Sequence, residues 1–162
     1  MNYSTENIED LREFLDLDYF FAHLGLRPIK SLFEHRIVND VTREEALAYV
    51  LWRSFFNPHH STCVMEARHV QAKNDILLLM KMYSRRLIDL GVGVIHRNST
   101  EIRFENKNRI SALCNPSSLR GRSINHGLVS TEISGETLKD IHNCLIPSIS
   151  SYQSSAGLIY FS

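Results

Sequence analysis

The chain has 162 residues, 43% of them hydrophobic and 22% charged, which is ordinary for one soluble globular domain. Eighteen basic and eighteen acidic residues give a formal net charge of zero, which argues against the strongly basic footprint of many nucleic-acid-binding domains. Three widely spaced cysteines favour reduced thiols and a cytoplasmic protein over a disulfide framework. We expect no membrane partner, because no apolar run, Ile76–Met80 included, approaches the ~18 residues that span a bilayer.

Hydrophobic periodicity divides the chain into alternating helices and strands. In chain order we predict a helix over residues 4–22, a short helix from Pro28, a strand at Ile37-Val38, a helix over 43–56, a strand over 62–65, a helix from His69 to about Leu90, strands over 94–96, 102–104, 110–114 and 127–130, a helix over 136–146 and a strand over 157–161. This order predicts one α/β domain with three layers, in which helices flank a mostly parallel central sheet. Residues 1–24 form an N-terminal helical segment and residues 25–162 the core.

Local signals place several boundaries. Asn39-Asp40 predicts a turn after the first strand, and Thr42 with Glu45 three residues later has the spacing of a capping box. Asn106–Asn108 predicts a hairpin turn. Pro147 is expected beyond the end of the last helix.

Ligands of parallel α/β sheets bind at the carboxyl ends of the strands. Two loops therefore stand out as candidate sites. The first is Asn39–Thr42, after the first strand, and the second is Thr131–Ser134, after the strand that ends at Ser130.

The order of these parts resembles the ATPase domain of the large terminase subunit, the DNA-packaging motor of tailed phages. The resemblance covers roughly residues 25–162. It is most specific in the hairpin E-I-x-F-x-N-x-x-x-I-x-A, which begins at Glu101, and in L-R-G-R-S, which begins at Leu119. It implies a P-loop-NTPase-like fold. Because the family continues into a coupling segment and a nuclease domain, the chain end at Ser162 implies a truncated motor domain without nuclease activity.

The resemblance also implies that both nucleotide-binding motifs are degenerate. In the family's phosphate-binding loop, Thr42 keeps the magnesium-binding hydroxyl, whereas Val41 stands at the lysine position and Asp40 at the glycine position. Glu132 matches the catalytic glutamate, and Thr131 replaces the aspartate that binds magnesium. The first loop is also too short. Phosphoryl transfer depends on such charged groups, so these changes argue against ATPase activity.

Each of these motif residues also has a simpler structural interpretation. Asp40 and Thr42 fit a helix cap after a turn, and Glu132 fits a solvated residue at a strand end. Arg120 and Arg122 could contact phosphate or a neighbouring subunit, or could decorate a surface turn.

A basic face is a further candidate site, which could bind nucleic acid. Its members, any of which could equally belong to a solvated surface, are Lys73, Lys81, Arg85, Arg86 and Arg97. We expect no metal site, because His59, His60 and Cys63 lack a second cluster of ligands. The cysteines Cys63, Cys114 and Cys144 are expected to be buried and inert.

The sequence thus predicts a non-catalytic, terminase-like pseudo-ATPase from a phage or phage-derived element, which needs no cofactor and acts through protein contacts. The expected partner is a packaging-motor component or a host factor. Two alternatives stay open. One is an active or partner-completed ATPase that uses ATP and magnesium, and the other is a nucleic-acid-binding accessory domain.

Overall fold

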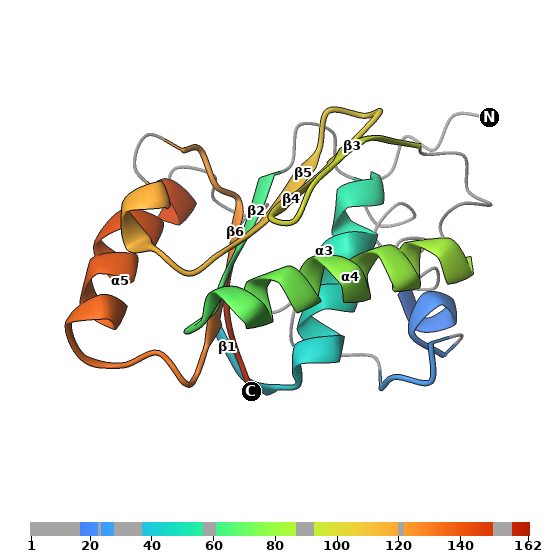
Figure 1. Cartoon of the computed structure of the whole chain (residues 1–162). Coiled ribbons are helices and arrows are strands. Elements are labelled where there is room, and N and C mark those ends of the chain that lie inside the picture. The colour runs from blue at the N-terminus through green and yellow to red at the C-terminus, as the bar shows by residue number, and fades with distance from the viewer. Residues whose placement is uncertain are drawn as a thin grey trace.

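A seven-stranded sheet runs through the middle of the molecule, with helices on both of its faces (Figure 1). The computed structural model describes residues 17–22, 24–27, 37–56, 61–86, 93–119, 122–150 and 157–162. The elements are β1 (Ile37–Val41), α3 (Arg43–Phe56), β2 (Ser61–Met65), α4 (His69–Arg86), β3 (Val94–Arg97), β4 (Glu101–Phe104), β5 (Arg109–Leu113), η2 (Pro116–Leu119), β6 (His126–Ser130), α5 (Gly135–Ser150) and β7 (Gly157–Phe161). Residues 17–22 form a further helix.

The strand order is β1-β7-β6-β2-β5-β4-β3. Neighbours from β1 to β5 pair in parallel, and only the β5–β4 and β4–β3 pairs are antiparallel. The predicted α/β class with a mostly parallel sheet is confirmed. Because β1, β7, β6 and β2 run in the same direction, their carboxyl ends meet at one edge of the sheet, which we call the carboxyl edge.

The larger apolar cluster lies on the α3 and α4 face of the sheet. Alternation along the strands turns Val64, Leu128 and Ile159 toward this face, as the period of two requires. Residues 46–52 of α3 are all buried. The helix at 17–22 belongs to the same layer, since Leu17 and its neighbouring phenylalanines join this cluster.

The opposite face is covered by α5 and η2. Ile141, Leu145 and Ile149 recur at helical spacing and pack against β-strand residues such as Val129. Gly127 permits this close approach, because a Cβ at that position would lie 2.9 Å from Leu145 Cδ1. Helices on both faces complete the predicted three layers.

The prediction of a turn at Asn39-Asp40 is wrong. The strand continues to Val41, and the pairing with β7 shifts register between Val38 and Val41. Asp40 takes a left-handed backbone with φ of 60°, which aspartate tolerates better than most residues. Asn39-Asp40 is therefore an irregularity within β1, after which Val41 pairs again with Phe161.

The prediction that the last helix stops before Pro147 is also wrong, since α5 continues to Ser150 with Pro147 inside it. Two sets of contacts explain why the helix continues past the proline. Ile149 is buried in the apolar cluster, and the Ser148 hydroxyl bonds to both the backbone N–H and the carbonyl of Ile124, at 2.8 and 3.2 Å. Tertiary contacts thus outweigh the hydrogen bond that proline removes.

Other local predictions are confirmed. Thr42 and Glu45 form the capping box. The turn at Asn106–Asn108 joins β4 to β5. The part of the first predicted helix over residues 4–16, the predicted helix from Pro28 and the predicted continuation of the α4 helix beyond Arg86 lie outside the described residues. Within the described chain, no helix is long and apolar enough to cross a membrane.

The β4–β5 turn is held against α3 by two amide side chains. Asn106 Nδ2 donates to the Ser54 carbonyl at 2.7 Å, and the fully buried Asn108 side chain donates to the same oxygen. Ser54 lies in the last turn of α3, where carbonyls lack partners within the helix. The hairpin thus caps the helix.

Replacing Asn108 with alanine should lower the free energy of unfolding by about 1–3 kcal/mol, because a buried hydrogen bond to a helix-end carbonyl is lost. Urea unfolding measures the change. Asn74→Ala, at an exposed position of α4, is the control and should alter stability by less than about 0.5 kcal/mol. Equal effects of the two substitutions would show that the hairpin does not anchor α3.

Candidate functional site

The first candidate loop has almost no length. Thr42 alone separates β1 from α3. The adjoining backbone is paired with the end of β7, since Ser162 N–H donates to Val41 O and Arg43 N–H donates to Ser162 O, both at 3.0 Å. A phosphate-binding loop wraps its phosphate in several successive backbone N–H groups. This connection has no room for such a loop.

The first turn of α3 is also satisfied by the protein itself. Thr42 Oγ1 accepts from Glu45 N–H at 3.2 Å, and Glu45 Oε1 accepts from Thr42 N–H at 3.1 Å. Together with the Arg43–Ser162 bond, these contacts use N–H groups that could otherwise face an anion. The helix start is closed by a cap.

A buried ion cluster occupies the carboxyl edge beside this cap. Arg43 forms a bidentate pair with Glu66, with Nε to Oε2 at 2.9 Å and Nη2 to Oε1 at 3.1 Å. Its guanidinium also lies over the Phe161 ring, 5.3 Å from the centroid. The Glu66 side chain is fully buried, whereas 26% of the Arg43 side chain is exposed. One side chain thus connects the carboxyl ends of β1, β7 and β2.

Asp75 of α4 completes the cluster. Its Oδ1 lies 3.4 Å from Arg43 Nε, and no hydrogen-bond donor contacts its buried Oδ2. Burial, a hydrogen bond to Glu66 and the charge of Glu66 together raise the pKa of Asp75 to about 9, with Arg43 acting in the opposite direction. Asp75 therefore favours its protonated form at neutral pH, beside the Arg43–Glu66 ion pair. The hydrogen bond to Glu66 likewise raises the pKa of Arg43.

Glu132 lies at the same edge but outside the ion cluster. With its amide oriented to satisfy both neighbours, Gln71 donates to Glu132 Oε2 at 3.2 Å and accepts from Arg68 Nη2 at 3.1 Å. The Glu132 backbone N–H donates to Ser130 Oγ at 3.3 Å. The glutamate is solvent-exposed and contributes to the electrostatic environment of Arg43.

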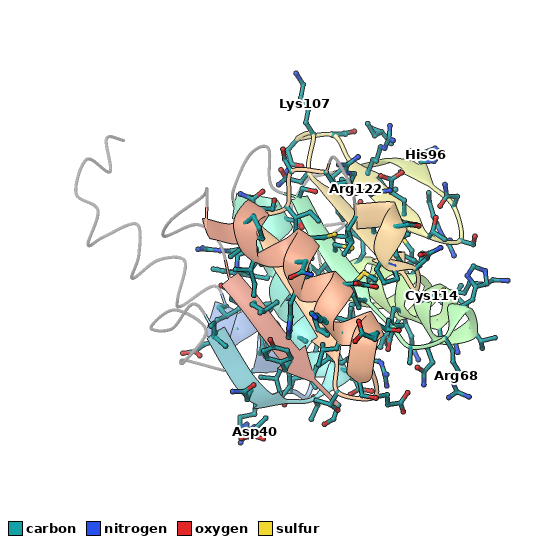
Figure 2. The ribbon with its side chains drawn as sticks, turned by 90° about the vertical axis from the view of Figure 1, so that its left-hand side faces the viewer. Asp40, Arg68, His96, Lys107, Cys114 and Arg122 are labelled. Atoms are coloured by element: carbon teal, nitrogen blue, oxygen red, sulfur yellow. The ribbon has the colours of Figure 1, made fainter. Side chains whose placement is uncertain are left out.

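The other predicted site residues are brought to this edge in structural roles. Val41 is only 2% exposed and packs in the core, so no side chain reaches out at the expected lysine position. Thr131 is exposed in the turn after β6, and its backbone N–H donates to Phe161 O at 2.9 Å. Asp40 points to solvent at the bottom of the view in Figure 2.

Arg122 does not join the site. Arg122 lies well above Asp40 in Figure 2, before the start of β6, where its Nε donates to Ser118 O at 2.8 Å and its Nη1 donates to Ser111 Oγ at 3.1 Å. Arg120 lies outside the described residues. Arg85 and Arg86 belong to the last turn of α4, and their side chains also lie outside what the structure describes.

The thiols differ in their surroundings. Cys63 is buried with its Sγ 3.6 Å from Met65 Sδ, and burial raises its pKa to about 12, as expected for an inert thiol. Cys114 and Cys144 are only half-buried, so the prediction of full burial is wrong for both. No group of metal-binding side chains is found among the described residues, which do not include His59 and His60.

The sequence reasoning missed Arg43, Glu66 and Asp75, the residues that define this edge. Two signals could have found them. Glu66 directly follows a buried strand, so it had to lie at the carboxyl edge. Asp75 stands between Ala72 and Leu79 on the apolar side of α4, where a carboxyl group requires a buried partner.

The fold is similar to that of phage large terminases. The large terminase ATPase domain of Thermus phage P74-26 matches with a TM-score of 0.67 and 14% identity, over 88% of this chain and 68% of that one. A point mutant of the same domain gives a TM-score of 0.69 and 12% identity, over 90% and 68%. The large terminase of the thermophilic bacteriophage D6E, in complex with ADP, gives 0.59 and 11%, over 93% of this chain and 38% of that one.

No family model and no curated protein sequence matches the chain. The predicted resemblance to the terminase ATPase domain is confirmed at the level of the fold.

Protonation of Asp75 gives the protein a specific dependence on pH. Between about pH 4 and about pH 9 the folded protein holds a proton that the unfolded chain releases, so stability falls as pH rises through this window. Asp75→Asn cannot ionise and keeps a donor toward Glu66. The melting temperature should therefore fall less between about pH 5 and about pH 8 in this variant than in the wild type. Asp140→Asn, at an exposed position of α5, should follow the wild-type curve; parallel curves for all three proteins would refute the assignment.

Arg43→Met should lower the free energy of unfolding by about 2–4 kcal/mol, because it leaves the buried Glu66 carboxylate without its cation. The double variant Arg43→Met/Glu66→Met should recover more than half of this loss. Chemical denaturation measures both. Arg27→Met is the matched control, because Arg27 pairs with Glu45 at 3.4 Å while its own side chain is 75% exposed, and it should cost less than about 1 kcal/mol. Simple additivity of the two single substitutions would contradict the coupling.

Proposed function

We propose that this chain is a non-catalytic terminase-like domain, a pseudo-ATPase that contributes to phage DNA packaging or its control through protein contacts. The fold supports the relation to packaging motors. The observation that carries the non-catalytic assignment is the position of Arg43. This cation stands in the first turn of α3, next to the point where a phosphate-binding loop would present its lysine, yet it is held by both oxygens of buried Glu66.

The charges at the carboxyl edge oppose a polyphosphate. At neutral pH the positive charge of Arg43 is balanced by Glu66, Asp75 is neutral, and Glu132 adds a further negative charge. A nucleoside triphosphate would add several more negative charges beside these carboxylates. Magnesium would find only the weak ligand Thr131 where the family offers an aspartate.

Completion of the site by a partner chain is less well supported. Such a partner would have to supply a phosphate-binding loop or cation and also separate Arg43 from Glu66. Separation would leave the fully buried Glu66 carboxylate unpaired, which costs about 3–5 kcal/mol in comparable pairs. Binding energy spent on that rearrangement would be lost to catalysis.

A domain with the outline of a motor subunit and no nucleotide site suits a role in assembly. It could take the place of a motor subunit, contact another packaging component or bind a host factor in the cytoplasm. Each of these roles depends on surfaces of the fold and not on chemistry at the carboxyl edge.

A nucleotide titration tests the proposal. Magnesium with a non-hydrolysable ATP analogue should leave the melting temperature unchanged, whereas a ligand at 100 times its Kd would stabilise the native state by about 2.7 kcal/mol. A terminase ATPase domain with an intact phosphate-binding loop serves as the positive control. A rise in melting temperature that disappears in Arg43→Met would overturn the pseudo-ATPase assignment.

A further inference from the structure

The outer face of α4 carries exposed aliphatic side chains. Val70 is 67% exposed and Leu77 is 57% exposed, and their separation of seven residues places them on the same side of the helix. Figure 1 shows α4 in front of α3, on the outside of its layer. Apolar side chains elsewhere on α4, such as Ile76 and Leu79, are buried against the core. The outward stripe is therefore separate from the packing face.

Cations accompany this stripe. Lys73 and Lys81 are exposed on the same side of α4, while its only carboxyl group, Asp75, is buried on the other side. The outer face of α4 therefore offers two aliphatic contacts accompanied by two exposed lysines.

We propose that this face of α4 docks an acidic amphipathic helix of a protein partner. The inference rests on the proposed function, because it assigns a surface and a partner chemistry to the contacts through which a non-catalytic domain acts. The aliphatic residues of the partner helix pack against Val70 and Leu77. Its glutamates or aspartates pair with Lys73 and Lys81 at the rim.

The dimensions fit a single partner helix. The stripe from Val70 to Lys81 extends about 16 Å along α4, or about three helical turns. Two helices in contact lie about 8–10 Å apart, which lets lysines beside the apolar line reach carboxylates on the partner. This is the arrangement in which an apolar stripe gives affinity and flanking charges choose the partner.

The aliphatic side chains favour protein over nucleic acid. Nucleic-acid interfaces are polar and strongly basic, and phosphates gain nothing from an exposed leucine. Interfaces between proteins, in contrast, place apolar residues at their centre and charges at their rim. Along α4, Lys73 lies between Val70 and Leu77, and Lys81 follows Leu77 by about one turn, so each aliphatic residue has a lysine beside it.

Three synthetic helical peptides of roughly 18 residues test the docking by fluorescence anisotropy. The first has a leucine stripe flanked by glutamates, the second replaces the glutamates with lysines, and the third replaces the leucines with serines. The first should bind at least about tenfold more tightly than the others. Lys73→Glu/Lys81→Glu and Val70→Ser/Leu77→Ser should each weaken its binding by about tenfold or more.

A matched control comes from α5, which also exposes a lysine and an aliphatic residue. Lys139→Glu/Ile146→Ser should leave peptide binding unchanged, and all three double variants should keep the wild-type melting temperature because they alter exposed positions. Equal loss in the control, equal affinity for the three peptides, or no binding of any peptide overturns the proposal. So does tighter, steeply salt-dependent binding of duplex DNA that the lysine variants abolish. The nucleotide titration is read independently, so failure of the docking is distinguishable from failure of the proposed function.

Discussion

The bidentate contact between Arg43 and Glu66 is the interaction on which the carboxyl edge depends. It neutralises a carboxylate that is fully buried, and it does so with a side chain that starts beyond β1 and crosses the end of β7. A charge buried without a partner is too costly to retain, so the pair fixes the position of α3 relative to β2. The same contact neutralises Arg43, the cation in the first turn of α3 that could otherwise bind a phosphate. In the proposed function, the Arg43–Glu66 pair therefore both stabilises the fold and withholds this cation from a nucleotide.

Much of the architecture could be predicted because it follows from local patterns. Alternating apolar strands and capped helices indicated the α/β class, and Thr42 with Glu45 marked the start of α3 correctly. The errors occur where long-range contacts outweigh local preference. Pro147 does not end α5, because burial of Ile149 and the Ser148 hydrogen bonds hold the final turn. Asn39-Asp40 resembles a turn in sequence, yet pairing of Val41 with Phe161 keeps it within the strand.

The position of the candidate site at the ends of the strands could be predicted from the sequence, but the residues that form its ion cluster could not. The two loops singled out in the sequence, Asn39–Thr42 and Thr131–Ser134, both lie at the carboxyl edge. The residues that dominate it come from three separate segments, and their pairing depends on strand order, which the sequence does not state. Arg43 follows β1 and Glu66 follows β2, and because β7 and β6 lie between these strands, the contact cannot be inferred from the sequence order. Asp75 owes its proton to burial against Glu66, an effect that appears only once α4 packs on the sheet.

Among the described strands, β1 forms one border of the sheet, and borders are where copies of a protein can add strand to strand and aggregate. Asp40 opposes the addition of a strand from a second copy along β1. Its left-handed backbone breaks the regular spacing of donors and acceptors, and its exposed carboxylate would meet the same charge on an incoming copy. Both features of Asp40 work against the pairing of a second copy along β1.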